Sequence, residues 1–492
     1  MNFSQFTKRS NRWIAKISNR NISIYFLIFF LAFFLRLLPE IIIRTYPVGY
    51  ETITYYAPAM IQFQDCSAVS FIEFLTNFLS TNQPFENTFV AGPFFYLLMF
   101  SLVEITGDNS FLILKIVAPV LYGVLALSFY FFSLKSLKFS KKTALLATIF
   151  MIFQIATLRI SWDRFRTVLA LVFFFISLIL ITKKDSLRNR VFLSGTILLT
   201  VLSRDYIGFL LIIVSLGYCL FEKKDFKKVL VISLPSIIVM ILILNPVYLN
   251  WNYFSQESIF FISNYLWGVQ DSLSIFIISF LLILPLVIKG FSKNSILNSM
   301  LIWLLLGSFS LIIFPWFSIP GYQRWLMLLV FPFSIYATLG LKKLNFGKYS
   351  SKFKIFYMSL ILILGISYSL GTFSYVILPN SYIPVNMVQS SIPWNEIDDV
   401  KEVLGWFDVN GVTNSTLLCE ERFLGWTQIY LKRDTVDVKI KGYIAGGSPL
   451  PIIEGIFSRQ IYLIWYIDNN YSGFEKLYSK GRIAIFEYTL VS

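Results

Sequence analysis

Acidic and arginine side chains recur beside aromatic residues at the ends of long apolar runs in this chain. Glu51 follows Gly49-Tyr50, Asp163 lies within Arg159–Arg166, and Arg204 and Arg324 each precede aromatic residues. Charges at the edge of a membrane are costly and usually face a cavity or a partner. The alternative is that these acids and arginines pair with one another and anchor helix ends. The chain contains no His, so proton transfer would have to rest on other groups, carboxylates first.

Acids and arginines together suit a reaction on a lipid-linked phosphate. An Arg fork binds phosphate through two hydrogen bonds and stays charged. A carboxylate held near apolar walls can deprotonate an acceptor hydroxyl as that hydroxyl attacks. Neither GxxxxGK[ST] nor GxGxxG is present, so no nucleotide site is indicated. The candidates are catalytic Glu51 and Asp163; donor-phosphate-binding Arg324, Arg204, Arg164 and Arg166; and a substrate wall of Tyr50, Tyr55, Tyr56, Trp162, Tyr322 and Trp325.

The distribution of Lys and Arg predicts a multi-pass membrane protein. The hydrophobic fraction is 56% and the charged fraction 14%, whereas about a quarter of the residues of soluble proteins are charged. Short cationic loops stay on the cytoplasmic side of a membrane. The net charge of +15 therefore reflects topology rather than nucleic-acid binding. Six cationic clusters are separated by apolar runs and lie at 8–20, 135–142, 183–190, 223–228, 289–293 and 342–354.

These clusters predict eleven crossings, since a span needs about 20 apolar residues. The N-terminal tail 1–21 is expected in the cytoplasm, a transmembrane domain at 22–378, and residues 379–492 outside. A large first external loop, 45–110, contains Val90–Thr106, which is expected to lie at the interface or to re-enter. The apolar cores of the crossings are Ile22–Ile43, Phe111–Leu134, Ala144–Leu158, Val168–Thr182, Val191–Ser203, Ile207–Phe221, Val229–Leu244, Leu273–Ile288, Ile296–Phe314, Leu326–Leu341 and Ile355–Leu378.

The region after Pro379 differs in character, because its apolar segments are too short to span a membrane. Alternating helices and strands at this spacing predict a small α/β domain with a mostly parallel sheet. Helices are expected at Asp399–Phe407, Phe423–Leu431 and Gly473–Tyr478, and strands at Thr416–Glu420, Val436–Ile440, Ile461–Ile467 and Arg482–Tyr488. Cys66 and Cys419 both fall outside in this topology, where they either pair or remain two thiols.

The order of these features resembles the GT-C superfamily of membrane glycosyltransferases, which includes protein O-mannosyltransferases, the lipid A aminoarabinose transferase and oligosaccharyltransferases. The family's first external loop begins with a catalytic acid in a G-x-D-x-x-x-Y-like context, which here reads Gly49-Tyr-Glu51-Thr-Ile-Thr-Tyr55. A P-x-x-Y stretch and a helix ending in Gly-Asp correspond to Pro93-Phe-Phe-Tyr96 and Gly107-Asp108. A later Arg-aromatic pair ahead of a Pro corresponds to Arg324-Trp325 and Pro332.

The tail carries a further likeness and two departures. Asn386–Pro393, with Gly425-Trp426 following, is similar to archaeal members of the superfamily whose substrate is unassigned. The acid is Glu51 where the family usually has Asp, so the base is displaced by a methylene or another residue serves. The tail lacks the WWD-type signature of oligosaccharyltransferases, which favours a monosaccharide donor on a single phosphate.

The resemblance implies an inverting glycosyltransferase in the cell membrane. It would move a sugar, such as mannose or another hexose, from a polyprenyl or dolichyl monophosphate to an extracytoplasmic protein, glycan or lipid. A lipid-linked sugar flippase is the alternative, although no inverted repeats are evident. No cofactor is expected to be required, because arginines can neutralise the phosphate. The sequence also allows a divalent cation (Mg²⁺ or Mn²⁺) bound by Glu51 and Asp163, with Glu257 or Asp271 as a third ligand.

Overall fold

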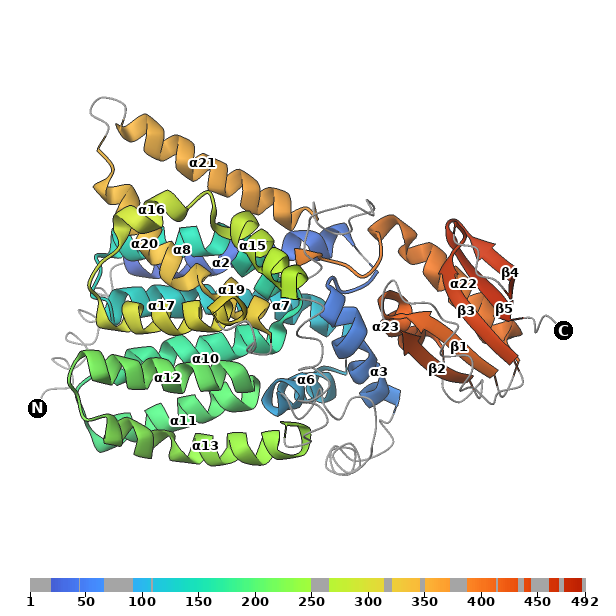
Figure 1. Ribbon diagram of the computed structural model, residues 1–492, viewed down its shortest axis with the longest axis horizontal. Coiled ribbons are helices and arrows are strands. Elements are labelled where there is room, and N and C mark those ends of the chain that lie inside the picture. Colours follow the sequence, from blue (N-terminus) through green and yellow to red (C-terminus); the bar gives the residue numbers. More distant parts are fainter. Residues whose placement is uncertain are drawn as a thin grey trace, which may run out of the picture. The chain divides into compact units, whose positions relative to one another are not determined.

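The computed structural model divides the chain into two units (Figure 1). It describes residues 19–43, 45–65, 92–107, 109–248, 265–313, 321–345, 350–371, 387–412, 415–431, 438–443, 460–468 and 473–488. The helical unit comprises Met1–Ile41, Phe89–Leu97 and Ile116–Leu370. The sheet unit comprises Ile42–Thr88, Leu98–Lys115 and Gly371–Ser492. Segments of the predicted first external loop, 45–110, thus group with the C-terminal residues rather than with the transmembrane helices.

The helical unit is built from apolar helices, as expected of a multi-pass membrane protein. Its longer helices are α2 (Asn19–Ile42), α7 (Ser110–Lys135), α8 (Lys141–Phe153), α10 (Phe165–Ile181), α11 (Leu187–Ser203), α12 (Asp205–Phe221), α13 (Phe226–Tyr248), α15 (Tyr265–Phe280), α17 (Ser295–Ser308), α20 (Val330–Lys343) and α21 (Ser350–Ser369). The shorter ones are α9 (Ile155–Asp163), α16 (Leu284–Gly290), α18 (Ser310–Ile313) and α19 (Tyr322–Leu328).

Each predicted crossing coincides, over its described residues, with one helix or a pair of helices. Within the described ranges, however, four helices are long and apolar enough to cross a membrane, or six if each of two bent pairs is one span. This is fewer than the eleven predicted. Three predicted crossings, α10, α12 and α17, are apolar helices of 17, 17 and 14 residues. At 1.5 Å per residue they fall short of the roughly 30 Å hydrocarbon core.

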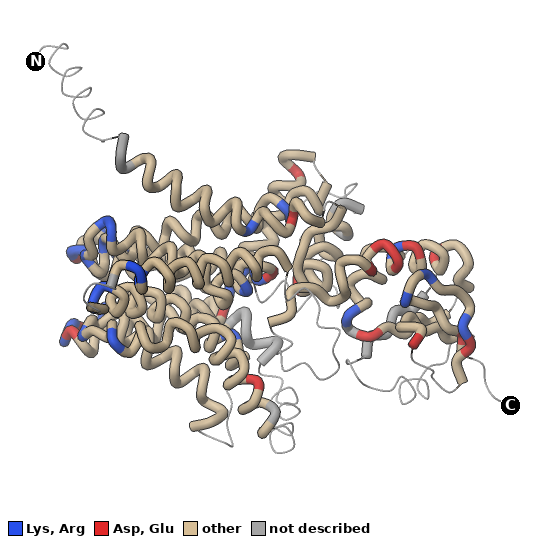
Figure 2. The backbone as a smooth tube through the Cα atoms, turned by 90° about the horizontal axis from the view of Figure 1, so that it is seen from above, with Lys and Arg blue, Asp and Glu red and all other residues tan. Residues whose placement is uncertain are grey.

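The cationic loops lie at one end of the helical unit, where Figure 2 shows blue segments gathered. At this end, contacts between helix ends and loops link Lys228 to Asp185 at 3.6 Å and Lys343 to the carbonyl of Phe291 at 3.5 Å. Lys342 likewise donates to Thr143. Loops far apart in the sequence are therefore neighbours in the fold, as a shared membrane side requires.

Two breaks interrupt helices inside this unit. At Gln154 the backbone is extended, and α8 and α9 meet there at a bend of 64°. The helical segments Gly268–Phe280 and Leu284–Gly290, from α15 and α16, are bent by 77°. The α16–α20 contact depends on Gly290 and Gly340, because a Cβ on either would overlap the backbone of the other helix. The bend at Gln154 turns the buried α9 away from α8, and α9 carries Arg159 and Asp163.

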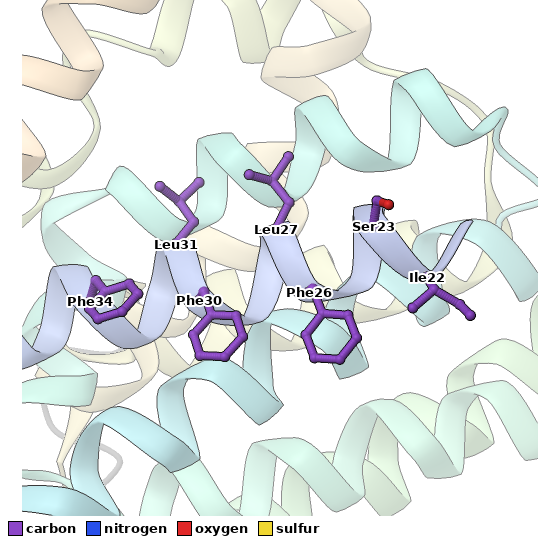
Figure 3. Close-up of a pocket in the computed structure, with 7 residues that line it drawn as sticks. All are labelled: Ile22, Ser23, Phe26, Leu27, Phe30, Leu31 and Phe34. Atoms are coloured by element: carbon purple, nitrogen blue, oxygen red, sulfur yellow. The ribbon is translucent and has the colours of Figure 1, made fainter. Parts of the chain in front are cut away.

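The first helix presents an apolar face. The rings of Phe26, Phe30 and Phe34 follow one another along α2, with centroids 6.0 and 5.7 Å apart. These side chains are 58%, 41% and 56% exposed, and with Ile22, Ser23, Leu27 and Leu31 they line an open hollow (Figure 3). Exposed rings at this spacing suit contact with lipid chains.

The sheet unit contains η1 (Thr52–Tyr56), α3 (Ala57–Asp65), most of α6 (Pro93–Thr106), α22 (Ile397–Asn410) and α23 (Glu421–Tyr430). Its five strands are β1 (Ser415–Glu420), β2 (Val438–Tyr443), β3 (Gln460–Tyr466), β4 (Phe474–Lys480) and β5 (Ile483–Tyr488), in the order β2-β1-β3-β5-β4. Strand β1 pairs parallel with β2 and β3, whereas β5 pairs antiparallel with β3 and β4.

One predicted element of the tail is wrong. Gly473–Tyr478 was expected to be helical, but Phe474–Lys480 forms the edge strand β4. The local sequence explains the strand, because Gly473 and Gly481, with φ of +83° and +52°, flank it, and Gly481 lies in the turn that joins β4 to β5. The sheet is consequently mixed rather than mostly parallel. The other predicted helices and strands of the tail overlap the observed ones, shifted by a few residues at their ends.

The start of the first loop packs into the core of the sheet unit. Tyr46 meets Trp426 edge to face at 5.3 Å. Gly425 lies against the backbone of η1, where an added Cβ would be 2.7 Å from the Cα of Thr54. The indole of Trp426 also donates to Ser391 at 3.1 Å. Helix α23 therefore supports the segment that carries Glu51.

Cys419 is a free thiol at the centre of this core, on β1. It is fully buried, and burial raises the pKa of the Cys419 thiol to about 12. The candidate partner Cys66 lies outside the described residues. Cys419 therefore acts as a small core side chain rather than as a reactive thiolate.

Candidate functional site

Two arginines from separate elements lie near Arg204 in the helical unit. The charges of Arg166 and Arg324 are both within electrostatic range of the Arg204 guanidinium. Arg204 is 8% exposed, and its Nε and Nη1 atoms have no hydrogen-bond acceptor among the described residues. The Nε atom lies 3.8 Å from the Asp205 carboxylate. Three cations with one nearby acid, at a place where donors lack acceptors, form a site suited to an anion.

Breaks between helices position these three arginines. Arg204 is the extended residue that ends α11 and begins α12. Arg166 lies in the first turn of α10, after the kinked Arg164. Arg324 lies in the first turn of α19, whose N-cap Gly321 has φ of +71°. The N-termini of helices α10 and α12 lie at these arginines and provide backbone N–H groups and a dipole that favours an anion.

Aromatic rings and one glycine hold the arginine side chains. The Arg166 guanidinium lies over the Tyr96 ring at 5.8 Å, and that of Arg204 lies over Tyr206 at 5.4 Å. The hydroxyls of Tyr206 and Thr167 are 3.1 Å apart. Gly92 packs against Arg166 so closely that an added Cβ would be 2.6 Å from its Cδ and 2.7 Å from the Ser203 carbonyl oxygen. This cluster of Arg166, Arg204 and Arg324 with its supports is hereafter the arginine cluster.

Replacing Gly92 with Ala is expected to disturb the arginine cluster, because the new methyl displaces both the Arg166 side chain and the backbone before Arg204. We expect binding of a polyprenyl phosphate to weaken about tenfold, measured with purified protein in nanodiscs. The matched control is Gly195→Ala on α11, where an added Cβ meets nothing within 4 Å. Unchanged lipid binding by the Gly92→Ala protein would show that Arg166 adapts and does not need this packing.

A second charged group lies around α9. Asp163 is fully buried and forms an ion pair with Arg159 one turn earlier. Arg36 of α2 pairs with Glu40 at 2.8 Å and donates to the carbonyls of Ser161 and Trp162 at 3.0 and 2.8 Å. Arg36 thereby satisfies carbonyls at the end of α9 that helix geometry leaves without partners.

Arg164 belongs with this second group rather than with the arginine cluster. Its Nη1 contacts the Met327 sulfur at 3.4 Å. Together with Arg36, Arg159 and Asp163 it is within electrostatic range of the Tyr368 hydroxyl. Of the four arginines predicted to bind phosphate, the structure thus brings together Arg166, Arg204 and Arg324.

Two residues of the predicted substrate wall are buried indoles. Trp162 packs between the Arg36 guanidinium at 5.4 Å and the Tyr368 ring at 5.8 Å. Trp325 packs over Gly307 and near Phe209. Tyr322, in contrast, is half-buried at the start of α19. The two indoles therefore help to hold α9 and α19 in place.

Glu51 lies in the sheet unit, between two unusual backbone features. Gly49 has φ of +131°, and Thr52–Tyr56 form the π-helix η1, of which Glu51 is the N-cap. Its side chain makes no capping hydrogen bond to that helix. Tyr50 and Tyr55 are half-buried, whereas Tyr56 is buried. Short π-helical turns occur frequently at functional sites, and the general-base role of Glu51 stays a prediction.

Two charged residues of the group around α9, Arg36 and Glu40, were not among the residues predicted from the sequence. They interrupt the first apolar run. An ionisable residue inside a membrane helix is a functional candidate by default, and that signal would have identified them. Asp271, predicted only as a possible metal ligand, is the one charged residue in the sequence of α15. Gln323, which donates to Asp271 at 3.1 Å, gave no comparable signal.

No set of three side chains suited to holding a metal ion occurs within the described ranges. Asp163 is engaged by Arg159, and Asp271 by Gln323. Glu257, the other predicted third ligand, lies outside the described residues.

No family model matches the chain, and no curated protein matches it by sequence. Among solved structures, the fold is similar to the crystal structure of ArnT from Cupriavidus metallidurans in the apo state. The two chains share 10% sequence identity, with 97% of this chain and 98% of that chain covered and a TM-score of 0.47. A likeness this distant carries no functional argument, so the proposals below depend on the chain's own residues.

Proposed function

We propose that the protein is an inverting membrane glycosyltransferase of the GT-C type, which moves one sugar from a polyprenyl monophosphate to an acceptor outside the cell. The observation that carries the proposal is the arginine cluster. A phosphate monoanion or diester needs several fixed donors and positive charge, and the cluster offers three guanidinium groups in an apolar helical body. Two donors of the buried Arg204 that lack acceptors among the described residues support an anion at this place.

In this proposal the arginine cluster binds the donor phosphate and stabilises it as the leaving group. The bond between the sugar's anomeric carbon and the phosphate oxygen breaks, and that oxygen keeps the electron pair. The acceptor hydroxyl attacks the same carbon from the opposite face, which inverts its configuration. Glu51 takes the hydroxyl proton. The arginines already neutralise the phosphate, so the reaction needs no metal.

The transfer reaction is the direct test. Purified protein is incubated with radiolabelled dolichyl-phosphate-mannose, or with other polyprenyl-phosphate hexoses, and a membrane extract that supplies the acceptor. Transfer of label that persists in excess EDTA supports a metal-independent glycosyltransferase. Transfer that EDTA abolishes would support a glycosyltransferase but contradict the metal-free mechanism. Movement of the donor across a vesicle membrane without transfer contradicts the proposal and supports a flippase.

The proposed orientation places the cationic loops in the cytoplasm and the sheet unit outside, because short Lys- and Arg-rich loops are retained inside. The grouping of these loops at one end of the helical unit agrees with their lying on one side of the membrane. We expect a reporter that is active only outside the cytoplasm to be active when fused after Ser492. The same reporter placed at Lys224, in the α12–α13 loop, should be inactive. The reverse pattern would overturn the orientation and with it the extracytoplasmic acceptor.

A further inference from the structure

We propose that Asp271 and Gln323 bind hydroxyl groups of the sugar that the donor phosphate carries. This inference rests on the proposed function and adds to it a residue pair that determines sugar specificity. Asp271 is a half-buried carboxylate on α15, and no ion-pair partner for it lies within the described ranges. Its one hydrogen bond is from the neutral amide of Gln323, at 3.1 Å. A carboxylate in an apolar helix without a cation is costly to maintain and calls for a ligand.

The first turn of α19 links this carboxylate to the arginine cluster. Gln323 contacts Asp271, and the next residue, Arg324, belongs to the arginine cluster. Helices α15 and α19 are in close contact here, since an added Cβ on Gly268 would be 3.2 Å from the Tyr322 hydroxyl. The Asp271–Gln323 pair and the arginine cluster are therefore joined through one turn of α19.

A sugar attached to the phosphate has the complementary chemistry. An ionised carboxylate has acceptor sites only, and an amide can donate and accept together. Sugar hydroxyls supply the matching donors and acceptors, and they carry no charge that Asp271 would repel. A site built to hydrogen-bond a hydroxyl also rejects analogues that lack it, because its own polar groups are then left unpaired. Asp271 and Gln323 thus favour a hydroxyl-rich sugar over the bare lipid phosphate.

The ratio of the affinities for sugar-bearing and bare lipid phosphate tests the proposal. Binding of polyprenyl phosphate and of polyprenyl-phosphate hexoses carrying mannose, glucose or galactose is measured on wild-type and Asp271→Asn protein in nanodiscs. The wild type should prefer one sugar-bearing lipid over the bare phosphate. The Asp271→Asn protein should bind the bare phosphate equally well or more tightly, because a repulsive charge is gone. Its ratio of affinities for the sugar-bearing and the bare lipid should fall about tenfold.

Asp185→Asn is the matched control, since it makes the same change on an exposed loop at the cationic end of the unit. It should leave both affinities unchanged. An Asp271→Asn protein that keeps the wild-type ratio overturns the inference. A wild type that binds all the lipids equally also overturns it, while leaving the phosphate site intact. If the wild type binds no polyprenyl phosphate at all, the proposed function fails first, and the two failures are thereby told apart.

Discussion

Replacing Glu51 with Gln is expected to lower sugar transfer by between about 10²- and 10⁴-fold, the range typical of a lost general base. The substitution keeps the size and shape of the side chain and removes the oxygen that takes the proton. The fold should tolerate it, because the Glu51 side chain does not cap η1. Donor binding should also be retained, since the phosphate site proposed here belongs to the helical unit. The readout is the rate of transfer at saturating donor.

Two companion variants separate chemistry from folding. Glu104→Gln makes the same change on α6 at an exposed position and should leave the rate unchanged. Glu51→Asp shortens the acid by one methylene and should retain part of the activity. If the Glu51→Gln protein keeps more than about a tenth of the wild-type rate, another residue is the base. If it loses its thermal unfolding transition instead, the role of Glu51 is structural.

Patterns with a local physical cause were predictable from the sequence. The apolar runs predicted the helices, and the cationic clusters predicted loops that share one end of the helical unit. The alternation of short elements predicted most of the C-terminal sheet. The errors have local causes too. Gly473 begins the segment that was assigned to a helix and Gly481 follows it, and with positive φ at both positions the residues between them form strand β4 of a hairpin. Fewer single helices are long enough to cross a membrane than predicted, in part because bends at Gln154 and after α15 divide apolar runs.

The candidate site was predictable by residue type and less so by grouping. Sequence spacing placed Arg164 and Arg166 together. The backbone kinks at Arg164, so that Arg164 lies in the group around α9 and Arg166 in the arginine cluster. Trp162 was predicted to line the substrate site, yet it packs in the interior between Arg36 and Tyr368. Such outcomes depend on contacts between helices far apart in the sequence. No local pattern in a single sequence encodes them.

Lysine substitutions in the arginine cluster should separate phosphate binding from membrane anchoring. Lys keeps the positive charge and loses the planar fork, so an anchor at the interface tolerates it whereas a phosphate clamp weakens. We expect Arg204→Lys to lower the affinity for polyprenyl phosphate by roughly 10- to 100-fold, as for lost hydrogen bonds between charged groups. Because two donors of the buried Arg204 lack acceptors among the described residues, Arg324→Lys should lose less affinity than Arg204→Lys.

The control for this series is Arg188→Lys, at the cationic end of the helical unit, where the guanidinium lies over Phe192. It should bind the lipid like the wild type. Arg164→Lys is the deciding comparison, because Arg164 contacts Met327 and belongs to the group around Tyr368. A larger loss for Arg164→Lys than for Arg204→Lys would place the phosphate in that second group. Wild-type affinity in both Arg204→Lys and Arg324→Lys would mean that these arginines anchor helix ends, and the donor site would then have to be sought away from the arginine cluster.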